Sequence, residues 1–175
     1  DACFPGGRGR ELTSADVLYS WKRMADEDNL PKSWWLFEET IAGFDEYRKA
    51  QNAAAQFDYD APVDGLEIID RCRFRVKLKQ PVQRFLWVLA MFQTAVVPRE
   101  AVETYGRRFG RHPVGTGPFV LREEDWMAGQ RMLFHRNPGY HGRFDPQRHR
   151  AVGSVAGVPV GTPLPLVDRL EIRMF

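Results

Sequence analysis

The sequence has few of the residues on which several common kinds of site depend. Its 175 residues include two cysteines, four histidines and four serines. Cys3 and Cys72 are too few for a small disulfide scaffold and lack zinc-knuckle spacing. They allow one disulfide, and the sequence leaves open whether it forms. No two histidines stand four apart with a glutamate between them, so we expect no metal site.

Catalytic and phosphate-loop motifs are also missing. No serine lies in a Gly-x-Ser-x-Gly elbow, and no cysteine–histidine signature is present. Gly115-Thr116-Gly117 is unlike a phosphate-binding loop, because Pro118 and a strand follow where Lys and a helix are required. Adjacent acids such as Glu38 and Glu39 point apart. We therefore expect a protein that is not an enzyme, with no catalytic residue and no cofactor.

Long apolar runs are absent as well. The longest, residues 85–92, has eight residues, against the roughly 20 that a membrane-spanning helix needs. With 43% apolar and 27% charged residues, the chain has the composition of an ordinary globular protein. These values predict no insertion into a membrane, and a packed core in one domain or two small lobes.

Positive charge is concentrated toward the C-terminus. Residues 1–98 carry 13 basic and 15 acidic side chains, whereas residues 99–175 carry 12 and 8. Twenty of the 25 basic residues are arginine, which would suit bidentate recognition of phosphate or carboxylate, although a solvated face or codon bias gives the same count. A nucleic-acid-binding or general interaction module built on this Arg-rich half is the alternative function, but no nucleic-acid motif accompanies the charge, so we expect no nucleic-acid partner.

Hydrophobic periodicity predicts a helix-rich subdomain over residues 1–112. A capping box of Thr13 and Asp16 starts a helix whose apolar face ends at Ala25. The other elements expected are a helical stretch from Ser33 past Ile41 with a break at Gly43, a helix over residues 45–55, a hairpin over residues 66–79 turning near Asp70-Arg71, a buried helix over residues 85–91, a buried strand end at residues 96–98, and a helix over residues 99–105 stopped by Gly106.

The remaining residues, 113–175, predict a sheet-forming segment. Strands are expected at residues 119–121 and 131–135, an irregular connection at residues 141–165, and a last strand at residues 170–174. That terminal strand needs partners, which can lie outside this chain. The fold class is therefore α+β, with helices packed on small antiparallel or mixed sheets.

Several segments, in order, resemble extracellular solute-binding protein family 5, the peptide- and nickel-binding receptors of ABC importers. Residues 11–23 fit the family's Leu-Thr-Ala-x-Asp-Val helix start, and residues 63–85 resemble its hairpin and following Pro-x-x-x-Phe helix. Its Pro-x-Gly-Thr-Gly-Pro-Phe/Tyr and Arg-Asn-Pro-x-Tyr motifs appear at residues 113–119 and 136–140. Residues 167–172 resemble the strand that follows.

The resemblance implies part of a type 2 periplasmic-binding-protein lobe. Family members are about three times longer and close two lobes around a solute, so residues 1–175 are expected to be an internal piece of the first lobe. The implied role is capture, without catalysis, of peptides or another small solute for delivery to the membrane permease. The implied location is periplasmic or extracytoplasmic, with any lipid anchor carried by an N-terminal segment outside this sequence.

The resemblance also implies which residues face the solute. Aromatic residues after the first helix, and the segment before the Val-Pro pair, line the cleft in relatives; here they match Trp34, Trp35, Phe92, Gln93 and Thr94. Neighbouring helical residues lie about 100° apart, so Trp34 and Trp35 cannot share one face, and either can instead belong to the core. The residues expected to be structural are Gly115, Thr116, Gly117, Pro118, Asn137, Pro138 and Tyr140.

Overall fold

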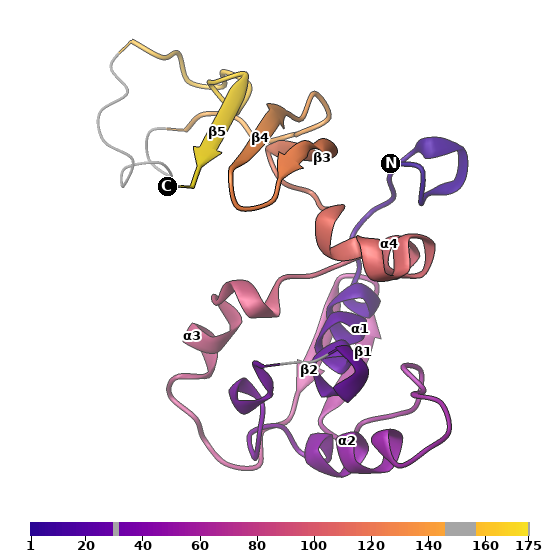
Figure 1. Cartoon of the computed structure of the whole chain (residues 1–175). Coiled ribbons are helices and arrows are strands. Elements are labelled where there is room, and N and C mark those ends of the chain that lie inside the picture. The colour runs from indigo at the N-terminus through magenta and orange to yellow at the C-terminus, as the bar shows by residue number, and fades with distance from the viewer. Residues whose placement is uncertain (30–31, 146–156, 175) are drawn as a thin grey trace. The chain divides into compact units, whose positions relative to one another are not determined.

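The computed structural model describes residues 1–29, 32–145 and 157–174, and it forms two compact units, Asp1–Thr104 and Tyr105–Phe175 (Figure 1). It has the predicted α+β composition. The assignment of residues 113–175 to the first lobe of a larger protein stays a prediction. Cys3 and Cys72 are both free thiols in the structure.

The first unit surrounds one aromatic-rich core. Trp21 of α1 packs on Phe37 and Phe74, with ring centroids 5.1 and 5.6 Å apart. Phe37, Ile41 and Phe44 are its largest fully buried side chains. The elements around this core are α1 (Ser14–Ala25), α2 (Phe44–Asn52), β1 (Leu66–Asp70), β2 (Arg73–Val76), α3 (Phe85–Leu89) and α4 (Arg99–Tyr105), with the 3-10 turns η1 (Pro5–Gly7), η2 (Glu27–Asn29), η3 (Trp34–Leu36) and η4 (Phe92–Thr94).

The start of α1 confirms the predicted capping box. The backbone N–H of Thr13 donates to the Asp16 carboxylate over 2.8 Å, and the negative charge lies at the positive end of the helix. Ser14 ties this end to the hairpin, because its backbone N–H donates to the carbonyl of Arg71 over 2.9 Å. The first helix is thereby fixed against the β1–β2 turn, side by side with β1 in Figure 1.

Two elements predicted in this unit are wrong, and a third, the helix α3, is present but only partly buried. The stretch from Ser33 past Ile41 forms only η3, because Glu39 takes a left-handed φ of 53° and Ile41 instead bridges Leu78 next to the hairpin. Residues 96–98 form no strand. The helix α3 is not buried on every side: Phe85 and Val88 face the core, whereas Leu86 and Trp87 are exposed. A lone amphipathic helix has one core-facing side, and an all-apolar run leaves the other bare.

The second unit is built on a three-stranded antiparallel sheet in the order β3-β4-β5. Its strands are β3 (Phe119–Met127), β4 (Arg131–Arg136) and β5 (Arg169–Arg173), preceded by the 3-10 helix η5 (Gly106–Arg111). The terminal strand β5 finds one partner within the chain, because it pairs with β4, Leu170 opposite Phe134; a partner outside the chain stays a prediction. Part of the expected irregular connection, residues 146–156, lies outside the described residues.

Candidate functional site

The two adjacent tryptophans differ in burial. Trp34 is 7% exposed, and its ring packs edge-on against Phe44 at 5.1 Å with the Arg48 guanidinium over it at 5.0 Å. Trp35 is 55% exposed. The prediction that the two side chains do not share one face is confirmed. Trp34 belongs to the core, and Trp35 lies at the surface.

The second predicted group, residues 92–94, is also split between surface and interior. Phe92 is 84% exposed, whereas Thr94 is buried. The Thr94 hydroxyl donates to the carbonyl of Met91 over 2.8 Å, so it fixes the turn that carries Phe92. The side-chain carbonyl of Gln93 is buried and accepts no hydrogen bond from the described residues.

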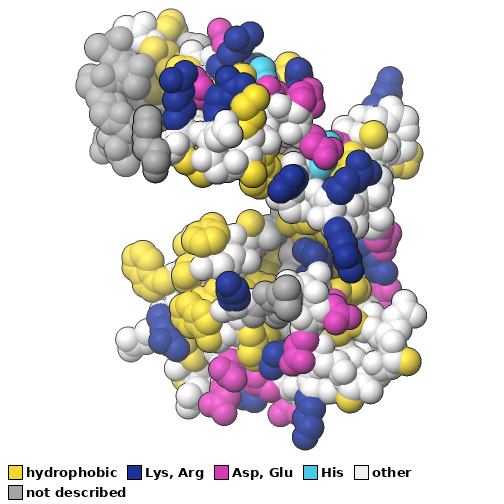
Figure 2. All heavy atoms as spheres, in the orientation of Figure 1, with side chains coloured by type: hydrophobic (Ala, Val, Ile, Leu, Met, Phe, Trp, Pro, Cys, Tyr) yellow, Lys and Arg dark blue, Asp and Glu magenta, His cyan; other side chains and the backbone are white. Residues whose placement is uncertain are grey.

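An apolar pocket of about 270 Å³ lies between η3 and α3, and Trp35 and Trp87 both line it. The remaining lining residues are Leu36, Arg84, Val88 and Met91. Trp87 is 77% exposed, and hydrophobic side chains gather on the side of this unit where α3 lies (Figure 2). Large exposed apolar groups around a hollow are typical of a surface that another molecule covers.

The sequence prediction missed Arg84 and Trp87. The signal was present: eight consecutive apolar residues cannot all face one core from a single short helix. The i, i+3 pair of Phe85 and Val88 marks the buried face, and Trp87 falls outside it.

The predicted structural motif is partly assembled by hydrogen bonds in the second unit. Asn137 donates from its side-chain amide to the carbonyl of Gly117 over 2.9 Å and from its backbone to Pro118 over 2.9 Å. The Tyr140 N–H donates to the carbonyl of Asn137 over 3.2 Å. These bonds join the entry of β3 to the exit of β4, while Gly115 is exposed.

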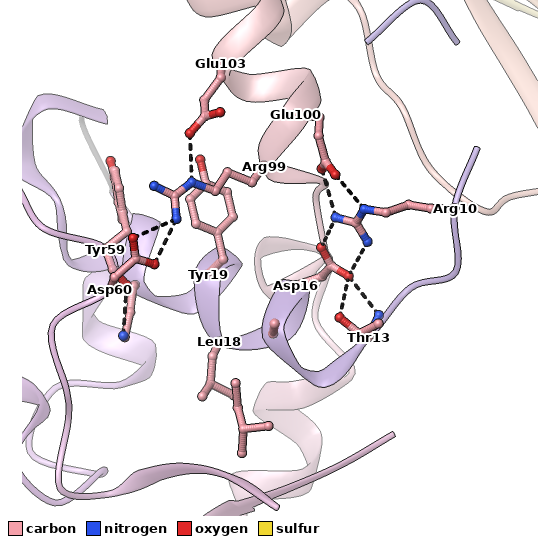
Figure 3. A pocket seen from close by; sticks show the side chains of 13 residues that line it. Arg10, Thr13, Asp16, Leu18, Tyr19, Tyr59, Asp60, Arg99, Glu100 and Glu103 are labelled. Carbon is pink, nitrogen blue, oxygen red and sulfur yellow. Dashed lines mark hydrogen bonds and ion pairs between the residues drawn. The ribbon is translucent and has the colours of Figure 1, made fainter. Parts of the chain in front are cut away.

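A second hollow of about 610 Å³, lined by both charged and apolar side chains, lies beside α1 (Figure 3). Arg10 donates to Asp16 and to Glu100 with nitrogen–oxygen distances of 2.6 to 2.8 Å. Arg99 bridges Asp60 and Glu103 in the same manner. Both arginines are thus paired with carboxylates, and the Arg10 pairs fasten residues 10–16 to α4.

The Arg10 pairs alter the protonation of both carboxyls. Burial raises the pKa of Asp16, but the hydrogen bonds from Arg10 and Thr13 outweigh it and hold the pKa below the ordinary 3.8. The hydrogen bond from Arg10 likewise lowers the pKa of Glu100 below 4.5. A carboxyl with a depressed pKa in the folded state adds stability above its ordinary pKa, and this stability is lost as the pH falls through the folded value.

We therefore expect Arg10→Gln to weaken the acid dependence of stability. Between about pH 5 and pH 2, the free energy of unfolding should fall more steeply in the unmutated protein than in this variant. Urea titrations at a series of pH values measure the slope. Arg75→Gln is the matched control, because Arg75 pairs with Glu67 where both are exposed. Equal slopes in the unmutated protein and the Arg10 variant would contradict the expectation.

No cluster of three or more His, Cys, Asp or Glu suited to a metal ion occurs among residues 1–29, 32–145 and 157–174. In the same described residues, no helix is long and apolar enough to cross a membrane.

Solved structures define the class to which this fold belongs. The structure of OppA from Burkholderia pseudomallei superposes with a TM-score of 0.60 and 29% sequence identity. The match covers 77% of this chain and 25% of the OppA chain. Peptide-bound OppA of Listeria monocytogenes matches 95% of this chain over 28% of its own, with a TM-score of 0.65 and 18% identity. The fold is that of part of a type 2 periplasmic binding protein.

The family follows from the sequence match. The model of bacterial extracellular solute-binding proteins, family 5 Middle, matches residues 8–175, and the chain belongs to this family. The periplasmic oligopeptide-binding protein OppA of Escherichia coli K12 is 29% identical over 135 residues, which are 75% of this chain and 23% of that protein. The glutathione-binding protein GsiB of Salmonella typhimurium LT2 is 34% identical over 99 residues, 57% of this chain and 19% of that protein. The chain thus spans less than a quarter of these relatives.

Proposed function

We propose that this chain is part of the substrate-binding component of an ABC importer, which captures peptides outside the cytoplasm and delivers them to the membrane permease without catalysis. The observation that carries the proposal is the pocket between Trp35 and Trp87, on a chain that belongs to solute-binding family 5. Named relatives bind oligopeptides or glutathione, itself a small peptide.

The shape and chemistry of the pocket support a peptide as the captured solute. Its lining is apolar apart from Arg84, and aromatic walls accept many apolar side chains without requiring one shape. Phe92 follows directly after Met91 of the lining and extends the apolar surface. Trp34 and Thr94 then support this surface from within, Trp35 and Phe92 lie toward the peptide, and Gln93 keeps its side-chain carbonyl buried.

Calorimetric titration with a pool of di- to pentapeptides tests the proposal. We expect saturable binding by the protein, weakened at least about tenfold in Trp35→Ala and in Phe92→Ala, because truncating a central aromatic anchor removes a large share of contact energy. Both side chains are exposed, so neither change should disturb the fold.

Ile69→Ala is the matched control. Ile69 is an exposed apolar residue on β1 that does not line the pocket, so its removal should leave the affinity unchanged. Loss of affinity in all three variants, or no saturable binding of any peptide, would count against the proposal. Salt-sensitive binding to oligonucleotides instead would favour the interaction module suggested by the arginines.

A further inference from the structure

The second unit contains a cationic hollow that the proposed peptide site does not use. It has a volume of about 660 Å³ and lies within this unit alone. Its six lining residues, termed here the arginine groove, are Arg122, His135, Arg136, Pro138, Asp168 and Arg169. Its lining therefore has three arginines and one carboxylate, whereas carboxylates outnumber the cations in the hollow beside α1.

The sheet places these cations next to one another. His135 of β4 lies directly between Val120 of β3 and Arg169 of β5. Arg122 follows Leu121 on β3, where the register between β3 and β4 shifts, and its side chain lines the same groove. Directly opposed side chains in such a sheet start roughly 5 Å apart and diagonal ones roughly 7–8 Å apart. Three strands thus bring Arg122, His135 and Arg169 to the lining of one groove.

Two of the arginines have unused donors. Neither Arg122 nor Arg169 forms a side-chain hydrogen bond or ion pair with the described residues. Arg136 approaches Asp168 only at 3.6 Å, and the Asp168 side chain is 88% exposed. The nearby carboxylate of Asp125 lies 2.9 Å from His135 Nε2, and so it is already engaged with the ring. Within the described residues, the lining therefore carries an excess of positive charge, and the guanidinium groups of Arg122 and Arg169 are unpaired.

We propose that the arginine groove binds a phosphate group. A carboxylate has two oxygens, which a single guanidinium fork satisfies, whereas a phosphate dianion offers more acceptors in a tetrahedral arrangement. Such a dianion matches the excess of two positive charges over the lining and can be reached from three strands at once. The same chemistry comes from free phosphate or from a phospholipid headgroup. The site is independent of the peptide pocket.

The test is calorimetric titration of the protein with inorganic phosphate at low salt. We expect one saturable site, weakened at least about tenfold in the double variant Arg122→Gln/Arg169→Gln, since each change removes charge-assisted hydrogen bonds. The matched control is Arg107→Gln/Arg108→Gln, which removes the same charge from exposed residues of η5 outside the groove. It should bind phosphate within about twofold of the unmutated protein, because neither arginine lines the groove and so neither donates a hydrogen bond to the anion.

Sedimentation with vesicles of phosphatidylglycerol and phosphatidylcholine separates the two sources. The ligand is a phospholipid headgroup if the protein binds vesicles, phosphate displaces them, and only the groove variant loses this binding. The ligand is the free anion if the protein binds phosphate but not vesicles. Equal weakening in both double variants, or no saturable binding of either probe, would overturn the site. Thermal melts should show both variants folded, because all four arginines are at the surface. Neither double variant should change the affinity for peptides. A failure of the phosphate site would therefore not contradict the proposed function.

Discussion

Replacing Phe44 by alanine should lower the free energy of unfolding by about 3–5 kcal/mol, the usual cost of removing a fully buried phenylalanine. Phe44 is 0% exposed, and its ring centroid lies 5.1 Å from that of Trp34, 5.9 Å from Phe37 and 6.0 Å from Tyr47. The variant loses both the transfer free energy of the ring and the contacts around the cavity left behind. Urea denaturation followed by tryptophan emission measures the loss, since four of the five tryptophans lie in the first unit.

Phe92→Ala is the control for this substitution. It makes the same chemical change at a side chain that is 84% exposed, so stability should change by no more than about 0.5 kcal/mol. Together the two variants separate the core from the proposed binding surface: Phe44→Ala should unfold more easily, whereas Phe92→Ala should remain folded and lose peptide affinity. A loss below about 1 kcal/mol in Phe44→Ala would contradict the packing of this core.

Local rules were sufficient for the elements whose signals are contained in a few adjacent residues. The capping box at Thr13 and Asp16, followed by helical periodicity, predicted α1 because these residues contact one another within one turn. The separation of Trp34 from Trp35 followed from the rotation between neighbouring residues in a helical turn. The α+β class likewise needed only the alternation of these patterns along the chain.

The elements that the sequence mispredicted are those whose structure depends on contacts between residues far apart in the chain. Ile41 was predicted to be helical, but it bridges Leu78, which lies 37 positions away. Competition between a helical turn and a distant strand is settled by tertiary contacts that no local window contains. For the same reason the sequence did not identify β4 as the partner of β5.

The candidate site could also be predicted only in part from the sequence. Resemblance to the family supplied Trp35 and Phe92, which lie on separate segments, but the pocket itself depends on the approach of η3 to α3. Trp87 comes from α3, 52 positions after Trp35, so only the folded chain brings the two together. The arginine groove is likewise assembled from three strands, and the sequence showed only an excess of arginine.

Replacing Gly65 by alanine should destabilise the first unit by about 2–3 kcal/mol. A Cβ built on Gly65 would lie 2.5 Å from the carbonyl oxygen of Ala42, 2.7 Å from Cγ2 of Ile41 and 2.8 Å from the Ala42 nitrogen. Two of these atoms belong to the backbone, which cannot rotate away as a flexible side chain does. The added methyl also restricts the unfolded chain, which offsets the loss by about 0.4–1 kcal/mol.

The clash lies where the hairpin is fastened to the core. The Gly65 carbonyl accepts a hydrogen bond from the Lys77 N–H over 2.9 Å, and the Lys77 carbonyl accepts one from the Ala42 N–H over 3.0 Å. Separating Gly65 from Ala42 therefore strains both bonds at Lys77. Urea denaturation gives the loss, with Gly115→Ala as control, since a Cβ at Gly115 meets no atom within 4 Å. Gly115→Ala should be neutral or slightly stabilising. Equal stability of the two variants would contradict the prediction that the hairpin packs on residues 40–42 through the close approach at Gly65.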